Sequence, residues 1–244
     1  MNELRSPTVM AAIVIGVALV LASVIGGWAF ASARRGEQTI TVTGSAKRRI
    51  KSDLVVWRAA VSYQASTLAE AYRSLSEAVP KVKGYMVSKG IPENEITISS
   101  ISSQTLHGRT SEGAESSEIT GYSLRQELEV RSKDVEKIGK IAREATELIN
   151  QGILLESGAP EYYYTALGNL KIEMMAEAAK DAKLRAEKIA ESTGSSIGSV
   201  KTARMGVLQI TPADSNEVSD SGMNDTSSLD KDITAVVSIG FAVD

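Results

Sequence analysis

The chain opens with one long apolar segment, and a far more polar remainder follows it. No residue from Val9 to Ala31 is charged, and roughly 20 apolar residues are enough for a helix to cross a bilayer core. Trp28 then lies at interfacial depth, shortly before Arg34 and Arg35. The pattern predicts a short tail over residues 1–8, a transmembrane anchor over 9–31 and a linker over 32–37.

A cleaved signal peptide is the alternative interpretation of the same segment. Ala29-Phe30-Ala31 and Ala31-Ser32-Ala33 both fit a cleavage site with small residues on either side. The apolar run is longer than the core of a usual signal peptide, which favours an uncleaved anchor. Positive charge is denser after the segment than before it, a bias that would place the main domain in the cytoplasm, but translocated domains often override weak biases. The charge pattern alone therefore leaves the sidedness open.

Small residues recur at every fourth position within the apolar segment. The two rows are Ala18, Ala22 and Gly26, and Ser23, Gly27 and Ala31. Such rows let helix backbones approach closely, so the anchor has a face suited to self-association. Alanine and glycine are also common in any anchor, so the rows equally fit a helix with no partner.

Beyond residue 38, stretches of two-residue period alternate with stretches of helical period. Strands are predicted over residues 39–46, 53–64, 96–101, 122–131, 200–210 and 233–243, with a strand-like stretch over 153–164 that Gly158-Ala159-Pro160 interrupts. Helices are predicted from Thr67, which begins a capping box, to about Gly90, then over 134–151 and 167–193, with Pro80 expected to kink the first. A loop is predicted over 108–118, and a polar insertion over 212–231.

These elements follow the order ββαββαβαββ. In the stretch 122–131, Leu124, Leu128 and Val130 face one way and charged residues face the other, which is typical of an antiparallel sheet with one covered and one wet face. Adjacent strands without crossover helices also imply antiparallel pairs. We therefore predict an α+β fold, with antiparallel sheets and helices packed on one face, preceded by one N-terminal transmembrane helix. Its single α+β domain spans 38–244, with an exposed acidic insertion at 212–231.

Composition narrows the possible chemistry. The 244 residues are 43% hydrophobic and carry a net charge of −3, which is typical of a globular protein and argues against nucleic-acid binding. The absence of cysteine excludes disulfides, thiolate metal sites and cysteine nucleophiles. His107 is the single histidine and lies outside any motif, so we predict a surface position for it.

Two segments carry patterns that resemble sites of catalysis or metal binding. Gly194-Ser195-Ser196-Ile197-Gly198 matches G-x-S-x-G, but that motif needs a strand-to-helix turn and a later histidine, so a helix C-cap is predicted instead. The insertion lacks the spacing of an EF-hand, which predicts a solvated loop. Its acidic residues, with the one that follows it, are Asp214, Glu217, Asp220, Asp225, Asp230 and Asp232. No catalytic, cofactor-binding or metal-binding residue is predicted.

Tyr162-Tyr163-Tyr164 is the one aromatic cluster of the chain. On a strand, Tyr162 and Tyr164 share a face and Tyr163 points to the other. Packing in the core and at its rim is one interpretation of the cluster. A contact between copies is the other, since tyrosine is favoured at interfaces.

Several segments together resemble the SIMPL-domain family. They are Ile40-Thr41-Val42-Thr43-Gly44-Ser45-Ala46, the strand with Asp53, Val56 and Trp57, Gly158-Ala159-Pro160-Glu161-Tyr162-Tyr163, Ala178–Ala182 and Ala186–Ala190, then Gly194, Gly198 and Gly206–Ile210. The resemblance covers roughly residues 38–244. It implies an α+β domain exported to the bacterial periplasm or anchored there, a link to oxidative and envelope stress, and assembly of some members into ring-like oligomers. It implies no catalytic residues. Pro80 and the insertion depart from the pattern.

The sequence predicts a membrane-anchored, extracytoplasmic, non-enzymatic protein that assembles with itself as an envelope or stress-related scaffold or channel-like oligomer. The absence of a nucleophile–base pair and of a metal-ligand cluster is the reason for this prediction. One alternative is a serine-type hydrolase that uses Ser195 or Ser196. The other is a stomatin-like membrane organiser, although such proteins continue into a long coiled coil and this chain ends in a strand.

Overall fold

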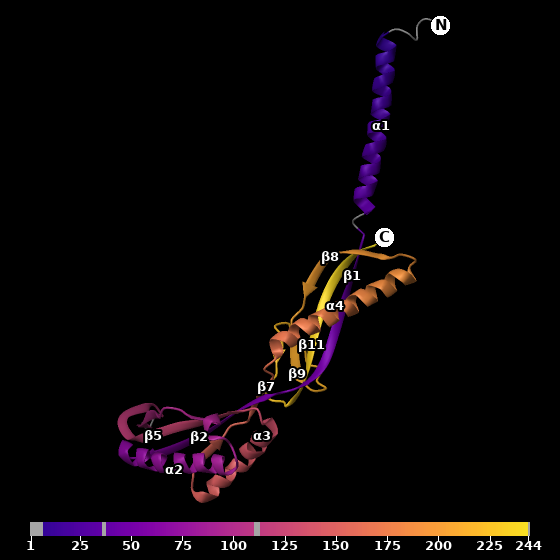
Figure 1. Cartoon of the computed structure of the whole chain (residues 1–244). Coiled ribbons are helices and arrows are strands. Elements are labelled where there is room, and N and C mark those ends of the chain that lie inside the picture. Colours follow the sequence, from indigo (N-terminus) through magenta and orange to yellow (C-terminus); the bar gives the residue numbers. More distant parts are fainter. Residues whose placement is uncertain (1–6, 36–37, 110–112, 244) are drawn as a thin grey trace. The chain divides into compact units, whose positions relative to one another are not determined.

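The computed structural model describes residues 7–35, 38–109 and 113–243 (Figure 1). Its contacts divide the chain into two compact units. The first unit comprises Met1–Ala46, Ile172–Val207 and Ala235–Asp244, and the second comprises Lys47–Lys171 and Leu208–Thr234. Three long elements contribute residues to both units: β1 (Thr39–Lys51), α4 (Leu167–Ser192) and β11 (Asp230–Val243).

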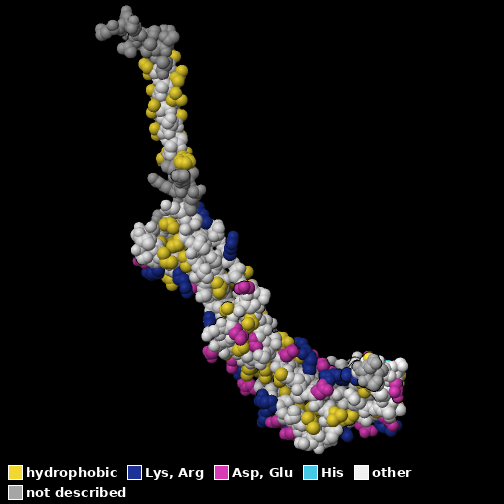
Figure 2. Space-filling model, turned by 180° about the vertical axis from the view of Figure 1, so that it is seen from behind, with side chains coloured by type: hydrophobic (Ala, Val, Ile, Leu, Met, Phe, Trp, Pro, Cys, Tyr) yellow, Lys and Arg dark blue, Asp and Glu magenta, His cyan; other side chains and the backbone are white. Residues whose placement is uncertain are grey.

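The first helix, α1 (Pro7–Arg35), carries the apolar segment. Its stretch Ile13–Phe30 has a mean hydropathy of 2.4 and no buried residue, so it is long and apolar enough to cross a membrane. Figure 2 shows hydrophobic side chains along this helix, and none of its coloured side chains is charged. A contiguous exposed apolar surface of this kind is typical of a segment that contacts a membrane or a partner.

The second unit is built on a central antiparallel pair of strands. Strand β2 (Leu54–Ala65) pairs with β5 (Glu115–Ser132) along its whole length, from Val55 opposite Ser132 to Ala65 opposite Tyr122. On the far side of β5 lie β3 (Ile96–Ile98) and β4 (Ser102–Arg109). The short 3-10 helix η2 (Glu93–Glu95) directly precedes β3 in the chain. On the far side of β2 lie β6 (Leu155–Ser157) and β7 (Glu161–Tyr163).

Two helices cover one face of this sheet, as Figure 1 shows. They are α2 (Leu68–Ser88) and α3 (Val135–Glu144), the latter continued by the 3-10 helix η3 (Ala145–Gln151). The core between sheet and helices contains fully buried Trp57, Leu75 and Leu128. The opposite face carries ion pairs, such as that from Arg58 Nε to Glu129 Oε2 at 2.9 Å. One covered and one wet face were predicted, and both are present.

The helix ends follow the predicted capping rules. The Thr67 hydroxyl accepts from Glu70 N and donates to Glu70 Oε2, and the Glu70 carboxylate also accepts from the Thr67 backbone N–H, which completes a capping box. Asp134 caps α3 through Lys137 N, and Gly152 ends η3 with φ of +78°. Helix α2 runs past Pro80 to Ser88 without ending.

The start of α2 departs from the apolar row that the rest of the helix buries. Leu68 and Tyr72 are exposed by 47% and 54%, whereas Ala71 and Ala78 are buried. Helical spacing of the apolar residues would place Leu68 and Tyr72 on the core face, but the structure buries only the later members of that row: Leu75, Val79, Val82 and Met86.

The first unit packs α4 (Leu167–Ser192) on strands β1 (Thr39–Lys51), β8 (Ile197–Met205) and β11 (Asp230–Val243). Strand β11 lies between β1 and β8, and its pairing with β8 is antiparallel. The buried residues of α4 in this unit recur every fourth position and are mostly alanine: Met174, Ala178, Ala182, Ala186 and Ala190. Their small size lets α4 approach β1 at Gly44.

The remaining strands belong to the second unit. Strand β9 (Gln209–Pro212) pairs antiparallel with the Lys231–Thr234 part of β11. Strand β10 (Met223–Asn224) adds a short parallel pair to β9. The predicted fold class is thus confirmed: the protein is a mixed α+β structure with antiparallel sheets, and one short pair is parallel.

Three predicted boundaries are wrong. The strand predicted over 200–210 is two strands, β8 and β9, because residues 206–208 between them are not strand. The strand predicted over 96–101 ends at Ile98, and the loop predicted over 108–118 is largely strand, because β4 reaches Arg109 and β5 begins at Glu115. Residues 110–112 lie outside the described part. Pairing between polar strands produced this hairpin, and polar strands leave no hydrophobic alternation to detect.

Candidate functional site

The polar residues singled out in the sequence do not form a catalytic cluster. His107 is exposed on β4, opposite Ile119 of β5. Ser195 and Ser196 belong to the first unit and His107 to the second. Within the described residues, no group of three or more His, Asp or Glu side chains is placed to hold a metal ion.

The G-x-S-x-G segment lies at a helix-to-strand turn. It leaves α4 through Gly194, whose φ is +76°, and enters β8 at Ile197. Ser195 N donates to Ala190 O, which ties the turn back to the last turn of the helix. The segment therefore occupies a helix C-terminal position, the opposite of the strand-to-helix turn that a nucleophile elbow needs.

The tyrosine cluster is half-buried. Tyr162 packs against the core of the second unit, whereas the Tyr163 hydroxyl donates to Glu161 Oε2 at 2.7 Å on the wet face. This hydrogen bond holds the pKa of Tyr163 above its usual value. The two neighbours thus face opposite ways, as the strand period requires, and Tyr164 lies just beyond the end of β7.

The acidic insertion is partly folded into the second unit. Asp225 accepts hydrogen bonds from Ser227 and Ser228, and buried Lys231 donates to the carbonyls of Tyr162 and Asp225. Burial lowers the pKa of Lys231. The Lys231 ammonium group contacts only the carbonyl of Tyr162, the carbonyl of Asp225 and the Asp225 carboxylate among the described residues. These contacts hold the insertion against β7.

Asp232 is the most heavily bonded carboxylate next to the insertion. Its side chain is 2% exposed and accepts from Arg49 Nε at 3.0 Å, from Lys47 Nζ at 3.0 Å and from Asp214 N at 3.0 Å. The Arg49 hydrogen bonds, with those from Asp214 N and Lys47, hold the pKa of Asp232 far below its usual range. This residue was expected to be solvated, and it is instead the anchor of β1 against β11.

We expect Asp232→Asn to lower the free energy of unfolding by about 2 kcal/mol at neutral pH, because charge-assisted hydrogen bonds to a buried acceptor are lost. Because the pKa of Asp232 is lower in the folded protein than in the unfolded chain, its ionisation stabilises the folded state at pH values above the unfolded-state pKa of about 4. That stabilisation is lost as the pH falls toward the folded-state pKa. Urea unfolding at pH 7 and pH 3 measures this. The gap between wild type and variant should narrow at pH 3, and exposed Asp220→Asn should show no gap at either pH.

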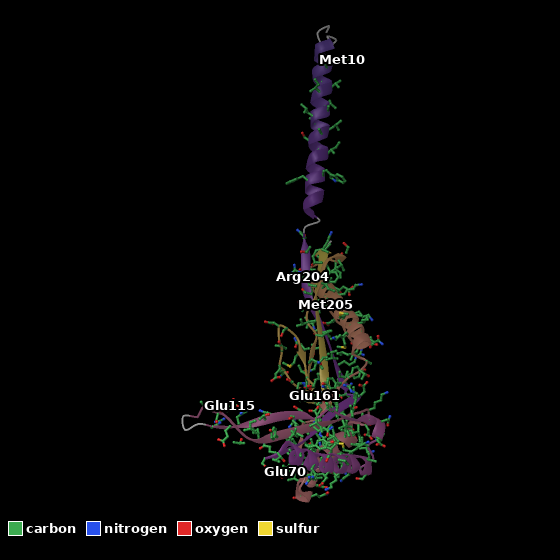
Figure 3. All side chains as sticks on the ribbon, turned by 90° about the vertical axis from the view of Figure 1, so that its left-hand side faces the viewer. Met10, Glu70, Glu115, Glu161, Arg204 and Met205 are labelled. Atoms are coloured by element: carbon green, nitrogen blue, oxygen red, sulfur yellow. The ribbon has the colours of Figure 1, made fainter. Side chains whose placement is uncertain are left out.

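A largely exposed two-stranded hairpin arm extends the β4–β5 pair of the second unit. We define the hairpin arm as residues 106–109 of β4 and 115–121 of β5, which lie beyond the last β2–β5 pair, Ala65 opposite Tyr122. Gly121 marks its base, because a Cβ there would lie 2.7 Å from Ala65 O. In Figure 3, Glu115 lies far out along this arm, away from Glu70 at the start of α2.

The hairpin arm has exposed faces and unpaired edges. Ile119 is 53% exposed, and among the arm's described residues only Gly121 is buried. In the described part of the chain, residues 115–121 of β5 pair with β4 alone, so their other edge has no strand partner. An isolated two-stranded hairpin is marginally stable in water, and such an edge can accept another strand.

The fold thus defines a mixed α+β protein with an apolar N-terminal helix, exposed strand edges and no assembled catalytic cluster among its described residues. The family model for SIMPL, described as a protein of unknown function (DUF541), matches residues 40–241. The chain therefore belongs to the SIMPL family, as its sequence motifs predicted.

Two curated relatives come from Brucella. The chain is 32% identical over 116 residues to the 26 kDa periplasmic immunogenic protein of Brucella melitensis biotype 1, which is 46% of each chain. The protein of the same name from Brucella abortus strain S19 matches with the same identity and coverage. The chain thus matches about half the length of these relatives.

Proposed function

We propose that this protein is a membrane-anchored, extracytoplasmic and non-enzymatic component that assembles with copies of itself through the hairpin arm. In this proposal, residues 9–31 are the anchor and residues 38–244 form the extracytoplasmic part. The exposed apolar surface of α1 and the periplasmic relatives support the location. The resulting oligomer acts as an envelope scaffold or a channel-like assembly, with the stress-related role that the family resemblance implies.

The unpaired edge of β5 over residues 115–121 is the observation that carries the proposal. A second copy of the same edge fits it in antiparallel register. Pairing centred on Ser117 places Glu115 opposite Ile119 and Glu118 opposite Ser116, so that no two carboxylates face each other. Anchoring in one membrane raises the local concentration of copies and favours such a contact.

The chain offers a clean test because it contains no cysteine. We expect Ser117→Cys to form a disulfide between two copies when the full-length protein is mildly oxidised in detergent. Val218→Cys is the matched control, since Val218 is 81% exposed but lies in the insertion. Non-reducing gel electrophoresis measures the dimer, which should be at least tenfold more abundant for the arm variant. Equal cross-linking of both variants would overturn pairing at this edge.

A second variant removes the arm. Replacing residues 106–121 by Asn-Gly leaves Thr105 opposite Tyr122 and closes a two-residue hairpin. The molar mass of the full-length variant, measured by light scattering, should fall from that of an oligomer to that of a monomer, while its urea unfolding midpoint stays near that of the wild type.

The Val218→Cys protein also reports on which side of the membrane the domain lies. A membrane-impermeant maleimide should label it in spheroplasts, and labelling only after lysis would contradict an extracytoplasmic location.

A further inference from the structure

A second surface of the protein has the properties of a binding site, independently of self-assembly. It is an open cleft of about 510 Å³ in the second unit, within the range of small-molecule sites. Its walls come from three segments of the chain: the end of α3 with the start of η3, the connection from β6 to β7, and the insertion at Ser227. We call it the Arg143 cleft.

Two residues that line this cleft, Arg143 and Tyr162, lie close to Gly139 of α3. A Cβ at residue 139 would lie 2.7 Å from the Tyr162 hydroxyl and 3.8 Å from Arg143 Nη1. The Tyr162 hydroxyl and the Arg143 guanidinium therefore both lie within 4 Å of the Cβ position of Gly139. Glycine inside a helix costs roughly 1 kcal/mol relative to alanine, and here it makes room for Tyr162. The geometry brings two hydrogen-bond donors together at the cleft wall.

The other hydroxyl groups of the cleft are already engaged. Ser157 Oγ accepts from Trp57 Nε1 at 3.1 Å and donates to Ala142 O at 2.9 Å. Thr146 Oγ1 donates to Arg143 O at 3.1 Å, and Ser227 Oγ donates to Asp225 Oδ1 at 2.6 Å. These bonds hold the hydroxyl groups in place, whereas the side-chain donors of Arg143 and Tyr162 have no hydrogen-bond partner among the described residues.

Charge selects the ligand class. Among the described residues that line the cleft, Arg143 alone is charged. In the described part of the chain its guanidinium has no ion-pair partner, in contrast to Arg49, Arg58 and Arg125, which all pair with carboxylates. One guanidinium fork matches one carboxylate in both charge and geometry. A phosphate monoester would bring more charge than this site balances.

We propose that the Arg143 cleft binds a small organic monocarboxylate. Arg143 pairs with the carboxylate, the Tyr162 hydroxyl donates a hydrogen bond to it, and the apolar body of the ligand lies against Pro160 and Ala159. The cleft is many times larger than a carboxylate, so the ligand has an apolar group of the size of a ring or a short alkyl chain. Gly158-Ala159-Pro160 thereby acquires a role beyond interrupting β6 and β7.

The test uses 4-fluorobenzoate as the probe and the full-length protein in detergent. Broadening and shift of the fluorine NMR signal measure binding, and neutral 4-fluorobenzamide is the matched probe without charge. We expect saturable binding of the benzoate in the millimolar range or tighter, and at least tenfold weaker binding of the benzamide. Arg143→Ala should weaken benzoate binding at least tenfold, and Tyr162→Phe several-fold.

Arg73→Ala is the control variant, because Arg73 is an exposed arginine on α2 that does not line the cleft. It should bind benzoate as the wild type does. Equal binding by wild type and Arg143→Ala, or equal binding of benzoate and benzamide, would overturn the proposal. Far-UV circular dichroism of each variant shows whether a loss of binding reflects a loss of folding. None of these outcomes depends on the oligomeric state.

Discussion

Replacing Trp57 by alanine is expected to destabilise the second unit by about 4 kcal/mol, near the upper end of what a single core truncation costs. The indole is fully buried between the sheet and the helices α2 and α3. Its Nε1 also donates to Ser157 Oγ, which in turn donates to Ala142 O. The substitution therefore leaves a large cavity and removes a hydrogen bond that fixes one wall of the Arg143 cleft.

Trp28 supplies the matched control, because it is the only other tryptophan and is 75% exposed on α1. Trp28→Ala should leave the free energy of unfolding unchanged, and it makes Trp57 the single tryptophan fluorophore. Urea unfolding of the full-length protein in detergent, followed by circular dichroism, compares the two variants. Hydrogen exchange should then show faster exchange in α2 and β5 of the Trp57 variant. A loss below about 1 kcal/mol would show that the site refills by repacking.

Replacing Gly44 by alanine is expected to destabilise the first unit by about 3 kcal/mol. A Cβ at residue 44 would lie 2.2 Å from Ala182 N and 2.3 Å from Ala178 O. Both are backbone atoms of α4, so no side chain can turn away to relieve the clash. Helix α4 must move off β1, and its hydrogen bond from Ser45 N to Asp181 Oδ2, now 2.8 Å, is lost with it.

Gly84→Ala is the control for this substitution. Gly84 lies in α2 with nothing within 4 Å of its Cβ position, so the added methyl group should stabilise the protein by roughly 0.5–1 kcal/mol. Opposite signs for the same chemical change would isolate the steric clash at residue 44. Hydrogen exchange in α4 and β8 measures the effect within the first unit. A stabilised Gly44→Ala protein would contradict the close approach of α4 to β1.

Local sequence patterns predicted most elements correctly. Thr67 and Glu70 form the expected capping box, and Asp134 and Gly152 bound the helix that the pattern indicated. These signals succeed because each depends on residues three or four apart, whose interactions do not need the rest of the fold. The fold class followed from the alternation in β5, which directly encodes a covered and a wet face.

The hairpin arm and the two-strand break at Gly206 escaped prediction for a different reason. The arm is mostly polar, with isolated apolar side chains such as Leu106 and Ile119, so its strands show no sustained apolar alternation, and pairing between them holds them extended. Asp232 was also misjudged, because its burial depends on Arg49 and Lys47, which lie more than 180 residues earlier in the chain. A local pattern cannot report such a partner.

The Arg143 cleft depends partly on local sequence and partly on contacts between distant residues. Gly158-Ala159-Pro160 interrupts a strand-like stretch in the sequence, whereas Gly139 was not singled out there. Their meeting is a tertiary event, because Tyr162 reaches over Gly139 only when β7 packs beside β2 and α3 packs beneath it. The unpaired state of Arg143 among the described residues likewise follows from where the carboxylates of distant segments come to lie.

By itself, the sequence determined the apolar helix, the α+β class, the family and the chemistries that lack of cysteine excludes. Each of these is written in composition or in short periodic patterns. Only the tertiary structure decided which strand edges stay open, which carboxylates are buried and where Arg143 meets Tyr162. Those features depend on contacts between residues distant in the chain, and such contacts are set by packing and by pairing rather than by local preference.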